Sequence, residues 1–377
     1  MKLLVFGAML IALPAALMVG GGTTGTAGEP APIVSDYKLL DPITHGDLTV
    51  FPVVSSHSHD TNQFLTLDEG VRSGEVVVTE VGNLHTMMRR RPIPPTFQGA
   101  ARVNNLVLVN NSDRPLILLA GEIVTGGKQD RVVGKDRIVP AESDPVDLGV
   151  FCVEPHRWAE KSAIGSFGTP TSVMAQPSVR KKAMVDKDQQ QVWNEVNNAK
   201  ANMTANVEAA PPAAGGGSAE NRRAVRELND TSSYAVAREN KVVQKQMQDI
   251  TEPMQKSYES LIKQLRNQNA VGVVVAVKGR IVWADMFAST ALLSKYWPKL
   301  LQSYAAEALT TPGDHRDVSM KEAQQFLDNW QARHETVDSE PGLYRQRELV
   351  GDRFRAFELT SLLPKANFDV HLSKMAE

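Results

Sequence analysis

The residues best suited to chemistry gather first in a polar stretch between apolar runs. It reads Ala120-Gly-Glu-Ile-Val-Thr-Gly-Gly-Lys-Gln-Asp-Arg131 and combines adjacent glycines with two cations, Lys128 and Arg131. Glycine backbones allow close approach, and N–H groups beside cations can hold an anion. The stretch is not a P-loop, because Gln129 follows Lys128 where that motif has Ser or Thr. We interpret it either as an anion-binding loop or as a turn whose charges pair with each other; the candidate contacts are Glu122, Gly126, Gly127, Lys128, Gln129 and Arg131.

A second polar stretch, Val150-Phe-Cys-Val-Glu-Pro-His-Arg-Trp158, adds the candidates Glu154, Arg157 and Trp158. Glu154 and Arg157 can form an ion pair, with the indole of Trp158 packed over the guanidinium. Cys152 precedes His156 by four positions, which raises the hypothesis of a thiol nucleophile. A small thiol in a strand is more often buried as core packing. We therefore assign no catalytic residue.

A metal site is not predicted. His57-Ser-His59-Asp60 resembles a ligand cluster, but a metal site needs about three or four ligands, and no spacing requires His45 or His85 to join it. The sequence contains no GxSxG elbow, HExxH helix motif or EF-hand loop. It therefore identifies no cofactor and leaves open whether the protein is an enzyme.

Composition excludes several classes. The 377 residues include one cysteine, so a disulfide framework and a cysteine-based zinc or iron–sulfur centre within one chain are excluded. A formal net charge of −2 argues against a nucleic-acid partner bound through a broadly basic surface. A charged fraction of 22% is typical of a globular protein with a core, not of a disordered chain.

The N-terminus has the pattern of an export signal. Lys2 precedes the apolar run Leu3–Val19, and small residues follow, with Gly25-Thr-Ala27 as a cleavage site. We expect residues 1–27 to be a signal peptide and the protein to be periplasmic or secreted. The alternative is an uncleaved N-terminal anchor, which would then supply the membrane contact.

Short runs rich in β-branched residues predict strands in the first part of the chain. Asn110-Asn-Ser-Asp113 separates two such runs and predicts a hairpin between Leu106–Val109 and Leu116–Leu119. Thr66–Val71 is expected to be a short helix. The expected strands are Leu48–Val54, Glu75–Glu80, Val103–Val109, Leu116–Leu119 and Val146–Val153.

The second part is predicted to be more helical. A polar helical pattern covers Pro177–Lys200, and a stripe from Val243 to Leu265 predicts an amphipathic helix broken near Pro253. Lys278-Gly279 predicts a hairpin turn. Helices are expected over Ser289–Leu309, with a kink near Pro298, and from a capping box at Ser319. Strands are expected over Val271–Val277, Arg280–Phe287, Arg345–Val350, Arg353–Thr360 and Phe368–Leu372.

This order of elements predicts an α+β fold, with a largely antiparallel sheet or sandwich core and packed helices in the C-terminal half. The segment 201–232 is rich in Pro, Gly and Ala and is predicted to be flexible. It could join two domains or interrupt one. We expect it to interrupt one domain, whose first part covers 33–200 and whose second part covers 236–375.

The two polar stretches together resemble the ARPP-1 domain. The resemblance rests on Gly121-Glu122, Gly126-Gly-Lys-Gln-Asp-Arg131, Val150-Phe-Cys-Val-Glu154 and Arg157-Trp158. Phe64–Glu69 and Glu75–Glu80 look like the family's approach to that core. Asp130 stands where an asparagine is usual, and His156 where a glycine is usual. The name denotes a domain associated with ADP-ribosylglycohydrolases and rhodanese-phosphatases, so the resemblance implies a loose link to nucleotide chemistry and no mechanism.

Three functional hypotheses follow. The first is a non-enzymatic exported domain that binds an unidentified small ligand or protein partner through the Gly121–Arg131 loop and the Cys152–Trp158 segment. The second is a hydrolase or a nucleotide- or ADP-ribose-processing enzyme, in which Lys128 and Arg131 hold an anionic group and Glu154 is the general base. The third is an envelope structural protein that oligomerises through the helix expected over 236–268.

Overall fold

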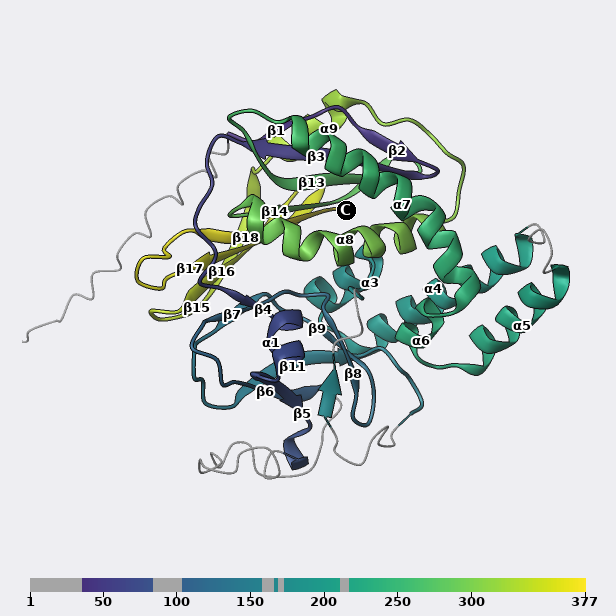
Figure 1. Cartoon of the computed structure of the whole chain (residues 1–377), viewed down its shortest axis with the longest axis horizontal. Helices are drawn as coiled ribbons and strands as arrows, with labels where there is room; N and C mark the ends of the chain where they lie inside the picture. Colours follow the sequence, from purple (N-terminus) through teal and green to yellow (C-terminus); the bar gives the residue numbers. More distant parts are fainter. Residues whose placement is uncertain (1–35, 84–103, 158–165, 169–172, 211–216) are drawn as a thin grey trace, which may run out of the picture. The chain divides into compact units, whose positions relative to one another are not determined.

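A large antiparallel sheet joins the two halves of the chain (Figure 1). The computed structural model describes residues 36–83, 104–157, 166–168, 173–210 and 217–377. These residues form a nine-stranded sheet in the order β1-β3-β13-β14-β18-β17-β16-β15, with β2 paired to β3. Its strands are β1 (Lys38–Leu39), β2 (Ile43–His45), β3 (Leu48–Ser55), β13 (Asn269–Val277), β14 (Arg280–Phe287), β15 (Ala332–Glu340), β16 (Tyr344–Gly351), β17 (Phe354–Ser361) and β18 (Asp369–Ala376).

The remaining described strands form a closed barrel and a small sheet. The barrel order is β11-β6-β5-β12-β8-β9, and β10-β7-β4 form the three-stranded sheet. The strands are β4 (Leu65–Thr66), β5 (Val76–Thr79), β6 (Asn105–Asn110), β7 (Leu116–Leu118), β8 (Ile123–Gly126), β9 (Arg131–Val133), β10 (Arg137–Val139), β11 (Val146–Cys152) and β12 (Ser166–Gly168). The predicted α+β class with largely antiparallel sheets is confirmed.

The hairpin predicted between Leu106–Val109 and Leu116–Leu119 is wrong. β6 pairs with β5 and β11, whereas β7 pairs with β10 and, in parallel, with β4. The turn exists, because the Asn110 side chain donates to the carbonyl of Arg114 and accepts from the N–H of Ser112. The same Asn110 amide also donates to the carbonyl of Pro140, so this turn carries the chain from the barrel to the small sheet.

Helices lie over and beside these sheets. They are α1 (Leu67–Ser73), α3 (Pro177–Lys181) with a π-helical turn over Lys182–Asp186, α4 (Gln189–Ala209), α5 (Gly217–Asp230), α6 (Tyr234–Arg238), α7 (Lys241–Gln264), α8 (Thr290–Thr310) and α9 (Met320–Asp328), with a 3₁₀ turn at Val81–Asn83. Helix α8 packs on β13 and α7, and its Tyr296 hydroxyl donates to the carbonyl of Ile117 in the small sheet. It therefore links the large sheet to the β-rich part.

Local signals at helix starts and at one turn are confirmed. The predicted capping box at Ser319 forms with Glu322 at the start of α9. The short helix expected over Thr66–Val71 is α1, and the structure adds a capping box of Thr66 and Glu69 at its start. The strands β13 and β14 form the predicted hairpin, and Lys278 and Gly279 both take positive φ angles in its turn. Such angles match a tight turn to the twist of the strands.

The break predicted near Pro253 is wrong, because α7 continues through that residue. An interior proline costs about 3 kcal/mol or more, but the apolar stripe of the helix is buried and offsets this cost. Val243 and Met247 lie in the cluster under α4 and α5, and Met254 and Tyr258 lie in the core of the large sheet. The stripe that suggested oligomerisation therefore packs within its own domain. The helix expected over Ser289–Leu309 is α8, with Pro298 inside it.

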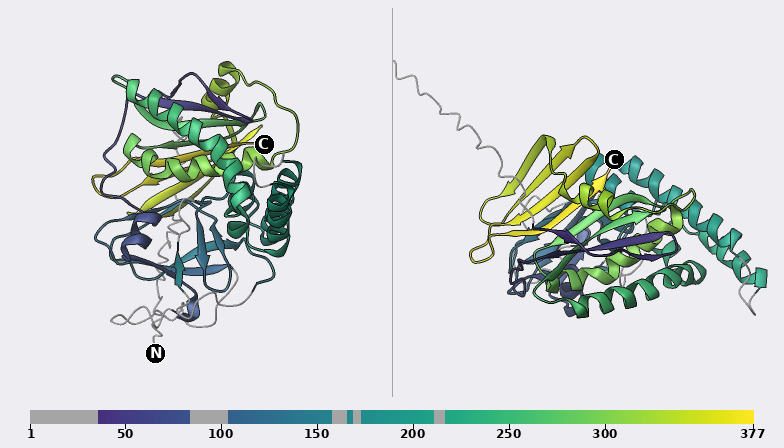
Figure 2. Two further views of the ribbon diagram at one scale, coloured as in Figure 1. Left: turned by 45° about the vertical axis from the view of Figure 1, so that its right-hand side comes forward. Right: turned by 90° about the horizontal axis from the view of Figure 1, so that it is seen from above.

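The segment expected to be flexible over 201–232 is helical on both sides of 211–216, which lie outside the described residues. Helix α4 extends to Ala209, and α5 begins at Gly217. Buried apolar residues stabilise these helices: Met203 and Val207 of α4 and Leu228 of α5 lie in one hydrophobic cluster. The prediction from composition did not take these residues into account. Figure 2 shows α4 and α5 extending outwards beside α7.

Residues Ser35–Glu377 cluster as one compact unit by their contacts. The main core draws on both expected parts of the domain, since Leu48 and Phe64 share it with Val275 and Tyr296. The expected signal peptide, 1–27, lies outside the described residues. Within the described residues, no helix has the length and apolar character needed to cross a membrane.

Candidate functional site

The two polar stretches meet at one end of the barrel. Strands β8 and β9 pair with Val124 opposite Arg131, and β9 also pairs with β11, with Cys152 opposite Arg131. The loop between β8 and β9 therefore lies beside the end of β11. Gly126 and Gly127 both have positive φ, and a Cβ at Gly127 would lie 2.4 Å from the Phe167 ring. Position 127 therefore requires glycine, both because its φ is positive and because a side chain would clash with the Phe167 ring.

Arg157 ties the two stretches together. Its guanidinium donates to the Glu154 carboxylate at 2.6 Å, to the carbonyl of Gly127 at 3.0 Å and to that of Gly126 at 3.4 Å. It lies 3.8 Å from Asp130, and its side chain is 19% exposed. A guanidinium can make these bonds at once because its donors form a planar fork.

Asp130 connects the loop to helix α6. One carboxylate oxygen accepts from the N–H of Gly126 at 3.1 Å, and the other accepts from the Ser233 hydroxyl at 2.7 Å. Ser233 is also the N-cap of α6, where it accepts from the N–H of Val236. The loop and the start of α6 are thus held by one carboxylate.

Arg131 and Glu80 complete this group, which we call the barrel-end cluster: Glu80, Asp130, Arg131, Glu154 and Arg157. Arg131 and Glu80 are both buried, with 3.9 Å between a guanidinium nitrogen and a carboxylate oxygen. Burial lowers the pKa of Arg131, and the nearby carboxylates oppose this effect. Glu80 also accepts from the backbone N–H of Lys128 at 3.2 Å. The barrel-end cluster therefore holds the backbone of the β8–β9 loop through hydrogen bonds.

The structure brings together Gly126, Gly127, Lys128, Gln129, Arg131, Glu154 and Arg157 of the candidates; Gln129 joins by donating to the carbonyl of Glu154. Lys128 and Arg157 are partly exposed, whereas Arg131 and Glu154 are buried. His156, which is exposed, takes a positive φ of 72°. Trp158 lies outside the described residues.

Glu122 is not part of this cluster. Its carboxylate accepts from the N–H of Leu119 at 2.8 Å and contacts the ammonium of Lys299 on α8. Lys299 also pairs with Asp68 of α1 at 2.8 Å. Burial by itself lowers the pKa of Lys299, but these two carboxylates raise it above its usual value. Glu122 therefore joins α8 to the β-rich part and does not face the loop.

Cys152 is buried in β11. The Gln189 side chain of α4 bridges its backbone, accepting from its N–H at 2.8 Å and donating to its carbonyl at 2.9 Å. Burial raises the pKa of the thiol, which opposes formation of a nucleophilic thiolate.

The histidines of His57-Ser-His59-Asp60 have separate surroundings. His57 lies 3.1 Å from Asp36, and His59 stacks on Phe368 at 4.3 Å between ring centroids. In the described part of the chain, no three His, Cys, Asp or Glu side chains are arranged to hold a metal ion.

Sequence reasoning missed a buried polar network centred on Asp285 of β14. Arg180 of α3 donates to both of its carboxylate oxygens, at 2.9 and 3.2 Å, and His371 of β18 lies 3.1 Å away. The other ring nitrogen of His371 lies 2.7 Å from Asp136, and Tyr304 of α8 donates to Asp285. The sequence feature that could have indicated this network is Asp285 itself, an aspartate within the apolar run of β14. A buried carboxylate needs hydrogen-bonding or charged partners.

Comparisons with known proteins add the family. Neither the curated proteins nor the solved structures contain a match to this chain. A family model, described as the ARG and Rhodanese-Phosphatase-superfamily-associated Protein domain, matches residues 36–375. This match covers nearly all of the sequence, including both polar stretches and the terminal strands. The chain therefore belongs to the ARPP-1 family.

Proposed function

We propose that this chain is a non-enzymatic, exported binding domain whose recognition surface is the loop over the barrel-end cluster. One observation carries the proposal: Arg157 bonds to Glu154 and to the backbone of Gly126 and Gly127. It thereby makes one preorganised surface from two separate stretches. Lys128 and Arg157, both partly exposed there, are the cations that would meet an anionic ligand or partner group.

The buried positions of Arg131 and Glu154 favour binding over hydrolysis. A general base must reach the proton that it removes, either directly or through one water. Glu154 is 4% exposed, and its Oε2 accepts from both Arg157 and the N–H of Asp130. The description of the family also names an association with other proteins and no reaction, which fits an accessory domain.

Export rests on the N-terminal pattern of Lys2, the apolar run Leu3–Val19 and the small residues up to Ala27. We expect the protein to leave the cytoplasm with residues 1–27 removed. N-terminal sequencing of the protein from fractionated cells tests this. A chain found in the cytoplasm with Met1 or Lys2 at its start would contradict export.

Ligand binding is tested by a thermal-shift screen of the whole chain with nucleotides, ADP-ribose, sugars and divalent metal ions. We expect an anionic compound to raise the melting temperature, and Lys128→Ala to remove this rise. Lys256→Ala provides the matched control, because Lys256 is exposed on α7 away from the loop. A compound that shifts both variants equally would contradict a site at Lys128.

The same samples separate binding from catalysis. Turnover of ADP-ribose or a nucleotide that disappears in Glu154→Gln, with the fold retained by circular dichroism, would support the hydrolase and contradict a purely binding role. No shift with any anion would contradict ligand recognition at this loop.

A further inference from the structure

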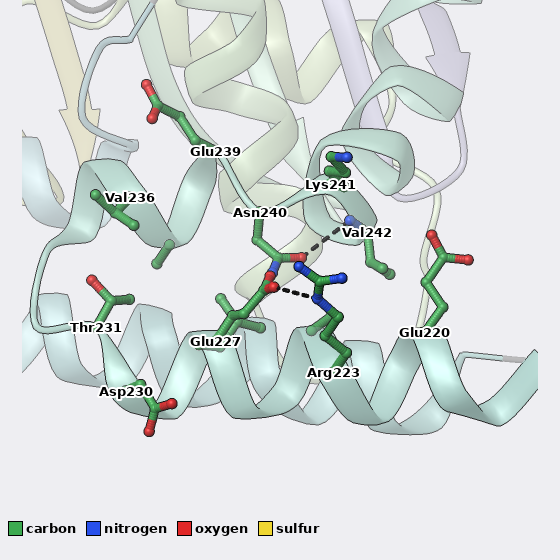
Figure 3. Close-up of a pocket in the computed structure, with 13 residues that line it drawn as sticks. Glu220, Arg223, Glu227, Asp230, Thr231, Val236, Glu239, Asn240, Lys241 and Val242 are labelled. Carbon is green, nitrogen blue, oxygen red and sulfur yellow. Dashed lines mark hydrogen bonds and ion pairs between the residues drawn. The ribbon is translucent and has the colours of Figure 1, made fainter. Parts of the chain in front are cut away.

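A groove opens between α5, α6 and the start of α7 (Figure 3). Its volume is about 760 Å³. Figure 3 shows α5 along one side, with Val236 of α6 and Val242 of α7 facing it from the other. The 14 residues of α5 correspond to about 21 Å of helix. A wall of this length can contact several successive turns of a helical segment.

One wall of the groove carries an exposed valine. Val236 is 45% exposed, and among the described residues the other exposed large hydrophobic is Val337, at 55%, on β15. Ala224, Leu228 and Ala237 are buried and close the floor. Val236 therefore offers one exposed apolar contact beside a buried apolar floor.

The rim of the groove carries more acidic than basic groups. Glu220, Glu227, Asp230 and Glu239 line it, against Arg223 and Lys241. Arg223 is already paired with Glu227 at 2.9 Å, and Glu227 also accepts from Asn240. The groove is therefore complementary to a segment of positive charge.

The wall formed by α6 is fixed in place. Arg238 donates to the carbonyls of Met174 and Gln302, at 2.7 and 2.9 Å, and Ser233 bonds to Asp130 at the other end of the helix. Docking onto a fixed wall costs little ordering of the groove itself.

We propose that this groove binds a cationic amphipathic helix of a partner protein. Apolar side chains on one face of that helix would cover Val236 and Val242, and lysine or arginine side chains would meet Glu220, Asp230 and Glu239. Recognition of an amphipathic helix in a groove commonly uses such anchors at helical spacing. The site is separate from the ligand surface at Lys128, so neither proposal depends on the other.

Fluorescence anisotropy with the whole chain tests the proposal. The probe is a labelled 14-residue peptide of leucine and lysine, with the leucines on one helical face; a matched peptide with glutamate in place of lysine is the charge control. We expect the leucine–lysine peptide to bind and the leucine–glutamate peptide not to bind. Added salt should weaken the binding, because screening reduces the attraction of exposed charges.

Substitutions locate the binding. Val236→Ser should weaken it about tenfold or more, and Asp230→Asn with Glu239→Gln should reduce both the affinity and its salt dependence. Val337→Ser and Glu252→Gln are the controls; they change another exposed valine and an exposed acid outside the groove and should leave binding unchanged.

Two results would overturn the proposal. One is equal loss of binding in the groove variants and in their controls. The other is a dimer in light scattering that Val236→Ser dissociates, since the groove would then hold a second copy of this chain. A change in melting temperature in the ligand screen at Lys128 has no bearing on either outcome.

Discussion

Gly121 allows the backbone to pass directly against the buried Arg180 side chain. Its φ is +94°, and a Cβ there would lie 2.6 Å from the Cγ of Arg180. Because Arg180 is held by Asp285 and stacks on Trp283, it has no freedom to move aside.

Gly121→Ala should therefore lower the free energy of unfolding by about 2–4 kcal/mol, from backbone strain and overpacking together. Gly74→Ala is the control, because Gly74 has a φ of +76° and a Cβ there would have nothing within 4 Å; it should cost about 1–2 kcal/mol from backbone strain alone. Urea unfolding measures both. Equal losses would show that Arg180 does not limit this position.

His371 lies between two carboxylates and is fully buried. Burial favours its neutral form, but Asp136 and Asp285 raise its pKa to about 9, from 6.5. The folded protein therefore binds this proton more tightly than the unfolded chain. The resulting stabilisation is complete below pH 6.5 and is lost as the pH rises through 9.

The difference corresponds to about 3 kcal/mol. We expect the unfolding free energy of the wild type to fall by this order between pH 6.5 and 9, and His371→Gln to remove this component of the slope. NMR titration of the imidazole gives the pKa directly. An imidazole that loses its proton below pH 7 would refute the assignment.

Helix α9 depends on a lysine from the last strand. The Lys374 ammonium donates to the carbonyls of Phe326 and Asn329 at the end of α9. It also lies over the rings of Phe326, Trp330 and Phe354, 4.3 to 4.8 Å from their centroids. Burial lowers the pKa of Lys374 to about 7, whereas carbonyls at a helix C-terminus and aromatic faces favour its charged form.

Lys374→Met should fray this end of α9, since it removes the donor and keeps the approximate volume. Amide exchange near Leu327 and Asp328 should become about tenfold faster, the equivalent of a lost hydrogen bond to a charged group. The start of α9, capped by Ser319 and Glu322, provides an internal reference. Unchanged exchange at the C-terminal turn would mean that packing alone holds the helix.

The same elements explain which parts of the fold could be predicted from the sequence. The capping box at Ser319, the short helix after Thr66 and the Lys278-Gly279 turn depend on neighbouring residues, and local patterns predict them correctly. The partners of β6 and β7 depend on strands distant in sequence, so a local turn signal gave the wrong pairing.

The candidate cluster was predictable in part for the same reason. The composition of the two polar stretches led to the hypothesis that they form one surface. No local sequence pattern indicated that Ser233 would bond to Asp130, or that Glu80 would bond to the backbone of Lys128. Glu122 was misplaced because its partner Lys299 lies on a distant helix.

For the whole molecule, the network around Asp285 connects the layers. Its members come from β14, β18, α3 and α8, and Asp136 lies beside β10. Arg180 and His371 hold the pKa of Asp285 well below its usual range, despite burial, which alone would raise it.

Asp285→Asn should lower the unfolding free energy by about 3–5 kcal/mol, because it leaves a buried guanidinium without its counter-charge. Glu377→Gln removes an acid from the exposed pair with Arg355 and should cost less than about 1 kcal/mol. Chemical denaturation compares the two. A small effect of Asp285→Asn would mean that Asp136 compensates.

The pairing of β3 with β13 sets the order in which the chain can fold. Leu48 lies opposite Val277, so the first long strand meets its neighbour only after the barrel and the helices α3 to α7 have been synthesised. Contacts between such distant residues slow folding. Until β13 has been synthesised, the backbone N–H and C=O groups on that edge of β3 lack their hydrogen-bond partners. A chain truncated before β13 would leave β3 without this neighbour in the large sheet.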